Sequence, residues 1–139
     1  MKKAFMVLGM SVLLALLGFT LIGCSRAGNT DEITKMEYKH ISQEEAARIM
    51  ANEKDIIIVD VRRPDEYASG HIPGAINIPN ETIGSASIPQ LPDKNRKILV
   101  YCRSGARSRQ ASSKLADMGY SNILEFGGII TWTGDIVTD

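Results

Sequence analysis

The sequence has few of the residues that metal sites and nucleic-acid sites require. Its histidines, His40 and His71, do not stand at metal-ligand spacing from each other or from a cysteine. Its 16 basic residues are matched by 16 acidic ones, so no excess of positive charge would attract a nucleic acid. No internal repeat or low-complexity tract is present. We therefore expect no metal, no cofactor and no nucleic-acid partner.

The first 23 residues are typical of an export signal rather than of a folded domain. Lys2 and Lys3 precede an apolar stretch, residues 4–23, that only two hydroxyl side chains interrupt. This length is close to the ~20 residues that span a bilayer, so a retained membrane helix is the alternative. Both interpretations place the rest of the chain outside the cytoplasm. Removing the two lysines leaves 14 basic against 16 acidic residues, so the exported part is slightly acidic.

The motif LIGC, residues 21–24, resembles the lipobox of bacterial lipoproteins, in which the cysteine is lipidated and becomes the mature N-terminus. Two lipid chains on Cys24 would attach the protein stably to a membrane. We therefore predict a signal peptide at residues 1–23, a polar tether at residues 24–34 and one domain at residues 35–139. The protein would be exported and lipid-anchored to the cell-envelope membrane, with its domain extracytoplasmic.

Lipidation of Cys24 would leave Cys102 without a disulfide partner in its own chain. A free thiol outside the cytoplasm is open to oxidation, so chemistry explains it better than packing. Many cysteines are simply small buried hydrophobes. The flanking sequence RSGAR, however, holds two arginines in five residues, which apolar packing does not require.

Strand patterns and helix patterns alternate along the domain. Continuous apolar runs at residues 56–60 and 97–101 predict buried strands of a parallel sheet. Shorter strands are predicted at residues 38–41, 75–79 and 122–126. The fold class is therefore α/β: a small, mostly parallel sheet of about five strands with helices on both faces. Cys102 follows the strand at 97–101, at the end of a strand where such sheets bind ligands.

Capping and breaking residues mark the helices between these strands. Ser42 and Glu45 form a capping box that opens a helix through about Ala51. Pro64 begins a short helix that ends at Gly70. A longer helix follows the cysteine loop and ends at Gly119, while residues 80–96 are predicted to be loop with one helical turn at most.

The segment CRSGARS, residues 102–108, can build a cradle for an anion. A loop that leads from a strand into a helix directs backbone N–H groups inward, and the helix N-terminus adds roughly half a positive charge. Gly105 permits backbone angles that other residues avoid, and the side chains of Arg103 and Arg107 add full charges. Such surroundings lower the pKa of a thiol, and the thiolate is the nucleophile.

Three motifs stand in the order and spacing of a known family: IIIVDVRRPDEYASGHIPGAINIP at residues 56–79, CRSGARS, and LADMGYSNILEFGGIITW at residues 115–132. From about residue 38 to residue 132 the sequence resembles the rhodanese family, the single-domain sulfurtransferases. The resemblance implies a catalytic Cys102 that carries sulfur as a persulfide. It implies a small anionic donor such as thiosulfate, a thiol or cyanide acceptor, and a substrate pocket lined by Arg103, Ser104, Gly105, Ala106 and Arg107. We expect a monomer.

Two other functions stay open on the sequence. Phosphatases and arsenate reductases also combine a cysteine with an arginine, but their arginine lies six positions after the cysteine, whereas Arg107 lies five after Cys102. Ser108 complicates that distinction, because a hydroxyl after the arginine is also common in phosphatases. A sulfide-sensing or redox-sensing interaction module is the second alternative.

Three further residues in the first motif are assigned structural roles. Asp60 and Arg62 are predicted to form a buried ion pair that supports the loop. His71 is expected to hold a turn through hydrogen bonds rather than to act as a general base.

Overall fold

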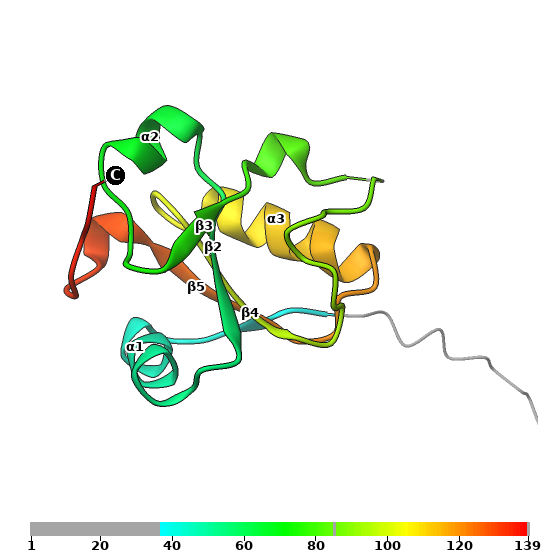
Figure 1. Cartoon of the computed structure of the whole chain (residues 1–139), viewed down its shortest axis with the longest axis horizontal. Helices are drawn as coiled ribbons and strands as arrows, with labels where there is room; N and C mark the ends of the chain where they lie inside the picture. The colour runs from blue at the N-terminus through cyan, green and yellow to red at the C-terminus, as the bar shows by residue number, and fades with distance from the viewer. Residues whose placement is uncertain (1–36, 85, 139) are drawn as a thin grey trace, which may run out of the picture. The chain divides into compact units, whose positions relative to one another are not determined.

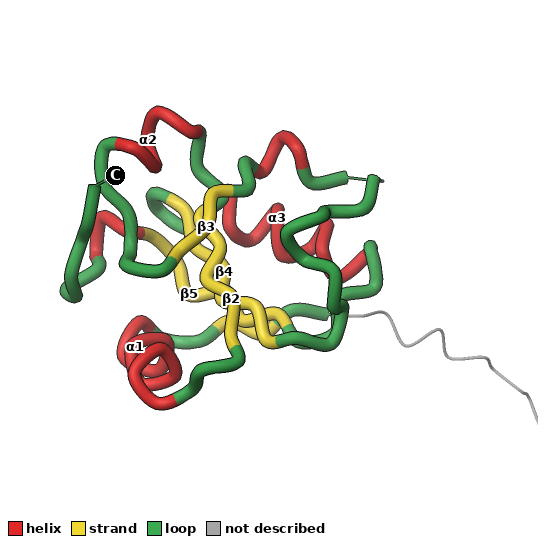
Figure 2. The backbone as a smooth tube through the Cα atoms, viewed as in Figure 1, coloured by secondary structure: helices red, strands yellow, loops and turns green. Residues whose placement is uncertain are grey.

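Five parallel strands form one sheet in the order β1-β5-β4-β2-β3. The computed structural model describes residues 37–84 and 86–138, so the predicted signal peptide, the LIGC motif and the tether lie outside the described residues. The strands are β1 (Lys39–His40), β2 (Ile56–Asp60), β3 (Ala75–Asn77), β4 (Lys97–Cys102) and β5 (Ile123–Gly128). The parallel five-stranded sheet confirms the prediction, and Figure 2 shows it between the helices.

Helices cover both faces of this sheet (Figure 1). They are α1 (Gln43–Asn52), α2 (Pro64–Ala68) and α3 (Ala106–Asp117), with 3-10 turns η1 (Asn80–Thr82) and η2 (Ile129–Thr131). One buried cluster joins Val100 of β4 to Leu115 of α3, and a second joins Leu99 of β4 to Ala46 of α1. Because successive side chains of a strand point to opposite faces, two covered faces require the unbroken apolar run that β4 has.

The predicted starts of the helices are confirmed, whereas of the five strands only β2 has the predicted bounds: β1 and β3 are shorter than predicted, and β4 and β5 extend further along the chain. The side chain of Ser42 accepts a hydrogen bond of 3.1 Å from the N–H of Glu45, which is the N-cap half of the predicted capping box, and α1 begins at the next residue, Gln43. Strand β4 extends to Cys102, and β5 extends to Gly128, because these two residues pair across an irregularity in the register. Cys102 is therefore the last strand residue and not the first loop residue.

No helix within the two described ranges has the length and hydropathy of a membrane span.

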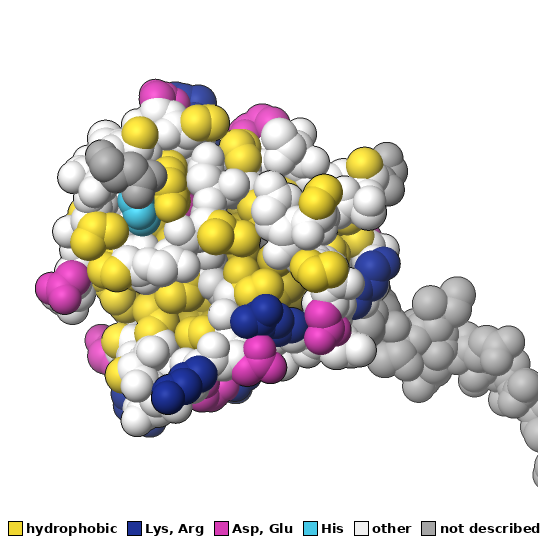
Figure 3. Space-filling model, viewed as in Figure 1, with side chains coloured by type: hydrophobic (Ala, Val, Ile, Leu, Met, Phe, Trp, Pro, Cys, Tyr) yellow, Lys and Arg dark blue, Asp and Glu magenta, His cyan; other side chains and the backbone are white. Residues whose placement is uncertain are grey.

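On the face shown in Figure 3, basic and acidic side chains lie beside one another below a broad apolar area. Charges of both signs are therefore mixed on this face, as the nearly balanced composition suggests.

Gly128 is required by a close approach of the cysteine loop to β5. A Cβ atom at this position would lie 2.2 Å from the carbonyl oxygen of Arg103 and 2.5 Å from the Cα atom of Ser104. The φ angle of Gly128 is −133°, which any residue adopts, so space and not backbone freedom demands glycine here. The loop that follows Cys102 is thus pressed directly against the end of β5.

We predict that Gly128→Ala will push this loop off β5. Overpacking of this kind costs on the order of 1–3 kcal/mol of unfolding free energy, which urea denaturation measures. Gly84→Ala is the matched control, because a Cβ atom at Gly84 meets nothing within 4 Å. Equal unfolding free energies for the two variants would contradict the prediction.

Candidate active site

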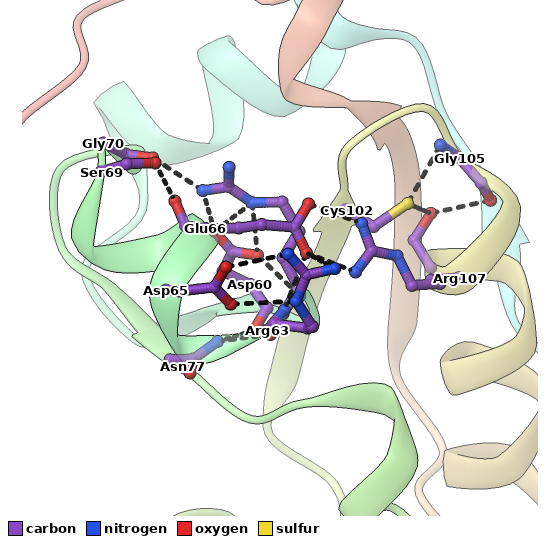
Figure 4. A network of polar contacts seen from close by, with 12 residues as sticks. Asp60, Arg63, Asp65, Glu66, Ser69, Gly70, Asn77, Cys102, Gly105 and Arg107 are labelled. Atoms are coloured by element: carbon purple, nitrogen blue, oxygen red, sulfur yellow. Dashed lines mark hydrogen bonds and ion pairs between the residues drawn. The ribbon is translucent and has the colours of Figure 1, made fainter.

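Cys102 lies at the tip of the central strand with its sulfur enclosed by the following loop. Its exposed fraction is 1%, and it is a free cysteine. The N–H of Gly105 donates a hydrogen bond of 3.0 Å to Sγ (Figure 4). The hydroxyl oxygen of Ser108 lies 3.5 Å from Sγ. The sulfur is therefore held by polar groups although it is almost completely buried.

The loop turns tightly because Gly105 adopts a left-handed conformation. Its φ angle is 102°, in the region that side chains disfavour, and it is the N-cap of α3. The helix begins at the next residue, Ala106, so its positive N-terminal end lies beside the sulfur. The predicted role of Gly105, to permit this backbone path, agrees with the observed angles.

Burial and hydrogen bonding act on the pKa of Cys102 in opposite directions. Burial alone would raise the pKa of the thiol, since it penalises the charged form. Hydrogen bonds from the side chain and N–H of Ser108, and from the N–H groups of Gly105 and Ser104, outweigh burial, and the pKa of Cys102 is lowered. The loop thus favours the thiolate, the reactive form of the side chain.

The two arginines of the loop differ in their surroundings. Arg107 donates two parallel hydrogen bonds to Glu66 of α2, with Nη1–Oε2 at 2.6 Å and Nη2–Oε1 at 2.8 Å (Figure 4). Arg103, Ser104 and Ala106 are exposed on the outside of the loop. The Arg107 guanidinium, predicted to add a full positive charge to the anion cradle, is therefore already engaged by a carboxylate.

Glu66 connects the loop to the short helix α2. The hydrogen bonds from Arg107 are the main reason that the pKa of Glu66 is lowered to about 2, and Arg63 contributes as well. Glu66 therefore stays ionised over the whole neutral range. This pair joins two segments that are far apart in the sequence, and the cysteine loop is braced by it from one side.

Asp60 and Arg62 form the predicted buried ion pair. Nη2 of Arg62 lies 2.6 Å from Oδ2 of Asp60, and the same guanidinium donates to the carbonyl oxygen of Gly70 at 2.7 Å. Asn77 donates to the carbonyl oxygens of Asp60 and Arg62. The Arg62 guanidinium also lies 5.9 Å from the ring centre of Tyr101, the residue before Cys102. Among the described residues the pair therefore contacts the segment after α2, β3 and β4, and it supports the predicted loop only through these elements.

His71 is buried in the same segment, and its ring nitrogen Nδ1 lies at hydrogen-bond distance, 3.1 Å, from the carbonyl oxygen of Tyr67 in α2. Its N–H and carbonyl bond to Val137 in an antiparallel bridge, and its ring stacks on that of Tyr67 at 3.8 Å. These contacts agree with the structural role expected of it.

Sequence reasoning did not identify three side chains around the loop. Ser108 is the last residue of the motif CRSGARS, but its contact with the Cys102 sulfur arises only because it lies in the first turn of α3. Glu66 and Glu125 are acidic residues in matching motifs, and nothing in their spacing indicates which loop residue each one contacts. Among the described residues, no group of three His, Cys, Asp or Glu side chains could hold a metal ion.

Comparisons with known proteins point to one family. The sequence matches the rhodanese-like domain over residues 42–135. It is 41% identical over 93 residues to a sulfurtransferase of Allochromatium vinosum, covering 66% of this chain and 85% of the relative. It is 41% identical over 71 residues to the thiosulfate sulfurtransferase PspE of Escherichia coli, covering 51% of this chain and 68% of the relative. A solved rhodanese with anions from E. coli superposes with a TM-score of 0.56 at 36% identity, covering 60% of this chain and 99% of that one.

We predict that Glu66→Gln will destabilise the domain at neutral pH and not at strongly acidic pH. The pKa of Glu66 is about 2 in the folded protein against an ordinary 4.5. A carboxyl group whose pKa is lowered by folding stabilises the folded protein fully at pH values above its ordinary pKa. This contribution is lost as the pH falls from about 4.5 towards 2. The difference in unfolding free energy should be at most about 1 kcal/mol, because the pair is partly solvated. Urea denaturation at several pH values, with exposed Glu37→Gln as control, measures it, and a pH-independent difference would contradict the prediction.

Proposed function

The chain belongs to the rhodanese-like domain family, and from this we propose that it is a sulfurtransferase that carries sulfane sulfur on Cys102. The observation that supports this most directly is the set of N–H groups and the hydroxyl that converge on Sγ. They lower the pKa of a buried thiol at the tip of the central strand. A lowered pKa provides the nucleophile, and the buried setting keeps water away from a reactive sulfur.

In the first half of the proposed reaction, Cys102 accepts a sulfur atom from a donor such as thiosulfate. The thiolate attacks the outer sulfur, the sulfur–sulfur bond of the donor breaks, and sulfite leaves with the electron pair. The product is a persulfide on Cys102. The N–H groups are already oriented before reaction, so they can stabilise the negative charge on the persulfide without rearrangement.

In the second half, an acceptor takes the outer sulfur. A thiolate or cyanide attacks it, the persulfide bond breaks, and the electron pair returns to Sγ as a thiolate. The same donors that stabilised the persulfide stabilise this leaving group. The two half-reactions never need both substrates together, so ping-pong kinetics are expected.

The loop residues have different parts in this scheme. The N–H groups of Ser104 and Gly105 face the sulfur, whereas Arg103 is exposed at the rim and can attract an anionic donor. Arg107 acts mainly as a brace, because Glu66 neutralises its charge. The positive character of the cradle then comes largely from backbone N–H groups and the start of α3.

We further propose that the domain is exported and anchored by lipid on Cys24. The support is sequence alone: the basic start, the apolar stretch and the LIGC motif. Each buried CH₂ of a lipid chain contributes about 0.8 kcal/mol, so two chains hold a protein on a membrane. The tether at residues 24–34 would join the anchor to the domain.

The sulfurtransferase proposal predicts that Cys102→Ser and Cys102→Ala abolish transfer of sulfur from thiosulfate to cyanide. Both replacements remove the nucleophile and leave the surrounding loop in place. Intact-mass measurement after thiosulfate treatment should show a gain of one sulfur atom in the unaltered protein and none in the variants. Retained transfer in either variant, or release of phosphate from an aryl phosphate in place of sulfur transfer, would refute the proposal.

The anchor proposal predicts that Cys24→Ser prevents lipid attachment. The unaltered protein should be recovered in the membrane fraction with added lipid mass, and the variant should lack this mass. Cys102→Ser is the matched control, because it removes the other cysteine and should leave the anchor intact. If the masses of the unaltered protein and the Cys24→Ser variant differed only by the substitution itself, no lipid would be attached at Cys24 and the anchor proposal would be refuted.

A further inference from the structure

The second acidic residue near the loop, Glu125 of β5, is completely buried. Its exposed fraction is 0%, although an ionised carboxylate is costly to remove from water unless partners compensate it. It does not belong to the Arg107–Glu66 pair or to the Asp60–Arg62 pair. Its side chain must therefore be explained by what it contacts.

Glu125 has partners on both carboxylate oxygens. Oε2 lies 2.6 Å from Nδ1 of His40 on β1, whose side chain is 65% exposed. Oε1 accepts hydrogen bonds from the hydroxyl of Ser108 at 2.5 Å and from the N–H of Gly127 at 2.9 Å. The carboxylate thus lies between a surface imidazole and the hydroxyl that also contacts the Cys102 sulfur.

Ser108 connects Glu125 to Cys102 through a single hydrogen. Its hydroxyl oxygen lies 2.5 Å from Oε1 of Glu125, 3.0 Å from the carbonyl oxygen of Gly105, 3.3 Å from the carbonyl oxygen of Gly127 and 3.5 Å from Sγ of Cys102. The carboxylate oxygen is the nearest of these acceptors. A hydroxyl can donate one hydrogen bond and accept others. When its hydrogen points to the carboxylate, the oxygen presents a lone pair to the thiol proton. When its hydrogen points to the sulfur, the oxygen can accept a hydrogen bond from the carboxyl group of Glu125 in its protonated form.

The two hydrogen bonds that join Cys102, Ser108 and Glu125 can therefore both run from Cys102 towards Glu125 or both run from Glu125 towards Cys102. We propose that Cys102 and Glu125 share one proton through Ser108, so that the thiolate forms as this proton moves to the carboxyl group. The inference rests on the proposed function only in that it explains how the nucleophile is formed. Ser108, which touches the reacting sulfur, is then a catalytic residue, and Glu125 is a positioning residue that acts through it.

The transfer is balanced and needs no other reactant. The S–H bond of Cys102 breaks as its proton binds the Ser108 oxygen, and the original hydroxyl hydrogen of Ser108 passes to Oε1 of Glu125. A thiol and a carboxylate become a thiolate and a carboxylic acid, and Ser108 is unchanged. Afterwards the carboxylic acid donates to Ser108, and Ser108 donates to the thiolate. His40 and the N–H of Gly127 can hold Glu125 in both states.

Sharing a proton keeps the buried charge constant. Ionising Cys102 next to an ionised Glu125 would place two negative charges within one buried cluster, which is unfavourable. Moving one proton between them leaves a single negative charge in the cluster. The titratable side chains that face Glu125 are His40 from β1 and, across Ser108 of α3, Cys102 from β4. The neutral side chain of Gln43 of α1 donates to the carbonyl oxygen of Gly128 at the end of β5, and the guanidinium of Arg109 lies over Gly105.

The shared proton predicts a particular titration curve for the full-length protein. Ultraviolet absorbance of the thiolate, with the Cys102→Ser curve subtracted, should rise with pH in two steps separated by a plateau, because the steps belong to the pair and not to one residue. The carboxyl carbon of Glu125, followed by NMR, should shift over the same two steps. A purely structural glutamate would not follow the titration of a cysteine.

Two variants test the path separately. Glu125→Gln keeps the shape but cannot take the proton, so the thiolate should appear in a single step. Ser108→Ala removes the connecting hydroxyl, so the plateau should vanish and alkylation of Cys102 by iodoacetamide at neutral pH should slow about tenfold, as expected for loss of one hydrogen bond to a charged group. Ser112→Ala is the matched control. Ser112 lies one helical turn further along, equally buried, with no hydrogen-bond partner for its hydroxyl in the described residues, and its removal should leave the curve unchanged.

The proposal would be overturned if Glu125→Gln, or Ser108→Ala where Glu125→Gln does not fold, reproduced the curve of the unaltered protein. This readout does not depend on sulfur transfer. A protein that titrates in two steps but gains no sulfur from thiosulfate would retain the shared proton and lose the sulfurtransferase proposal. If the unaltered protein transfers sulfur but the variants titrate as it does, the sulfurtransferase proposal stands and the shared proton is refuted.

Discussion

A sulfur atom that is buried and negatively charged needs hydrogen-bond donors on several sides, and the path of the cysteine loop follows from that need. The donors come from the N–H groups of Ser104, Gly105 and Ser108 and from the Ser108 hydroxyl, all within seven residues of sequence. Such convergence requires a tight turn, which the left-handed conformation of Gly105 provides. It also requires the loop to lie flat against the neighbouring strand, which the missing side chain of Gly128 allows. The helix that follows then begins with its positive end beside the sulfur.

The central place of β4 in the sheet determines which other groups reach this loop. Strand β2 lies on one side of β4 and strand β5 on the other. From the β2 side come the buried Asp60–Arg62 pair and helix α2, whose Glu66 holds Arg107. From the β5 side come Glu125, which contacts Ser108, and Gly128, which contacts the loop backbone. The sulfur is therefore supported from both neighbours, and each support acts through a different residue of the loop.

Two full positive charges near the sulfur, those of Arg107 and Arg62, are paired with carboxylates, Arg103 is exposed at the rim, and the partial charges of backbone N–H groups face the reacting atom. Arg107 and Arg62 each bond to a carboxylate, so neither guanidinium is free to approach the sulfur without first losing a short hydrogen bond. Backbone N–H groups carry smaller charges but are fixed in direction by the fold. They can stabilise a thiolate, a persulfide and a returning thiolate in turn, since none of these requires the donors to move.

Much of this molecule could be predicted from local sequence. The apolar run of β4, the N-cap serine Ser42 and the glycine in the cysteine loop each specify local backbone geometry, because they act over a few neighbouring residues. The Asp60–Arg62 pair was predictable for the same reason, as its members are two residues apart. By contrast, 41 residues separate Glu66 from Arg107, and 85 separate His40 from Glu125. No local pattern encodes such pairs; only the order of the strands brings them together. The sequence by itself determined the strands and the reactive cysteine, whereas the tertiary structure decided which carboxylates reach its loop, because parallel strands bring distant residues to one edge.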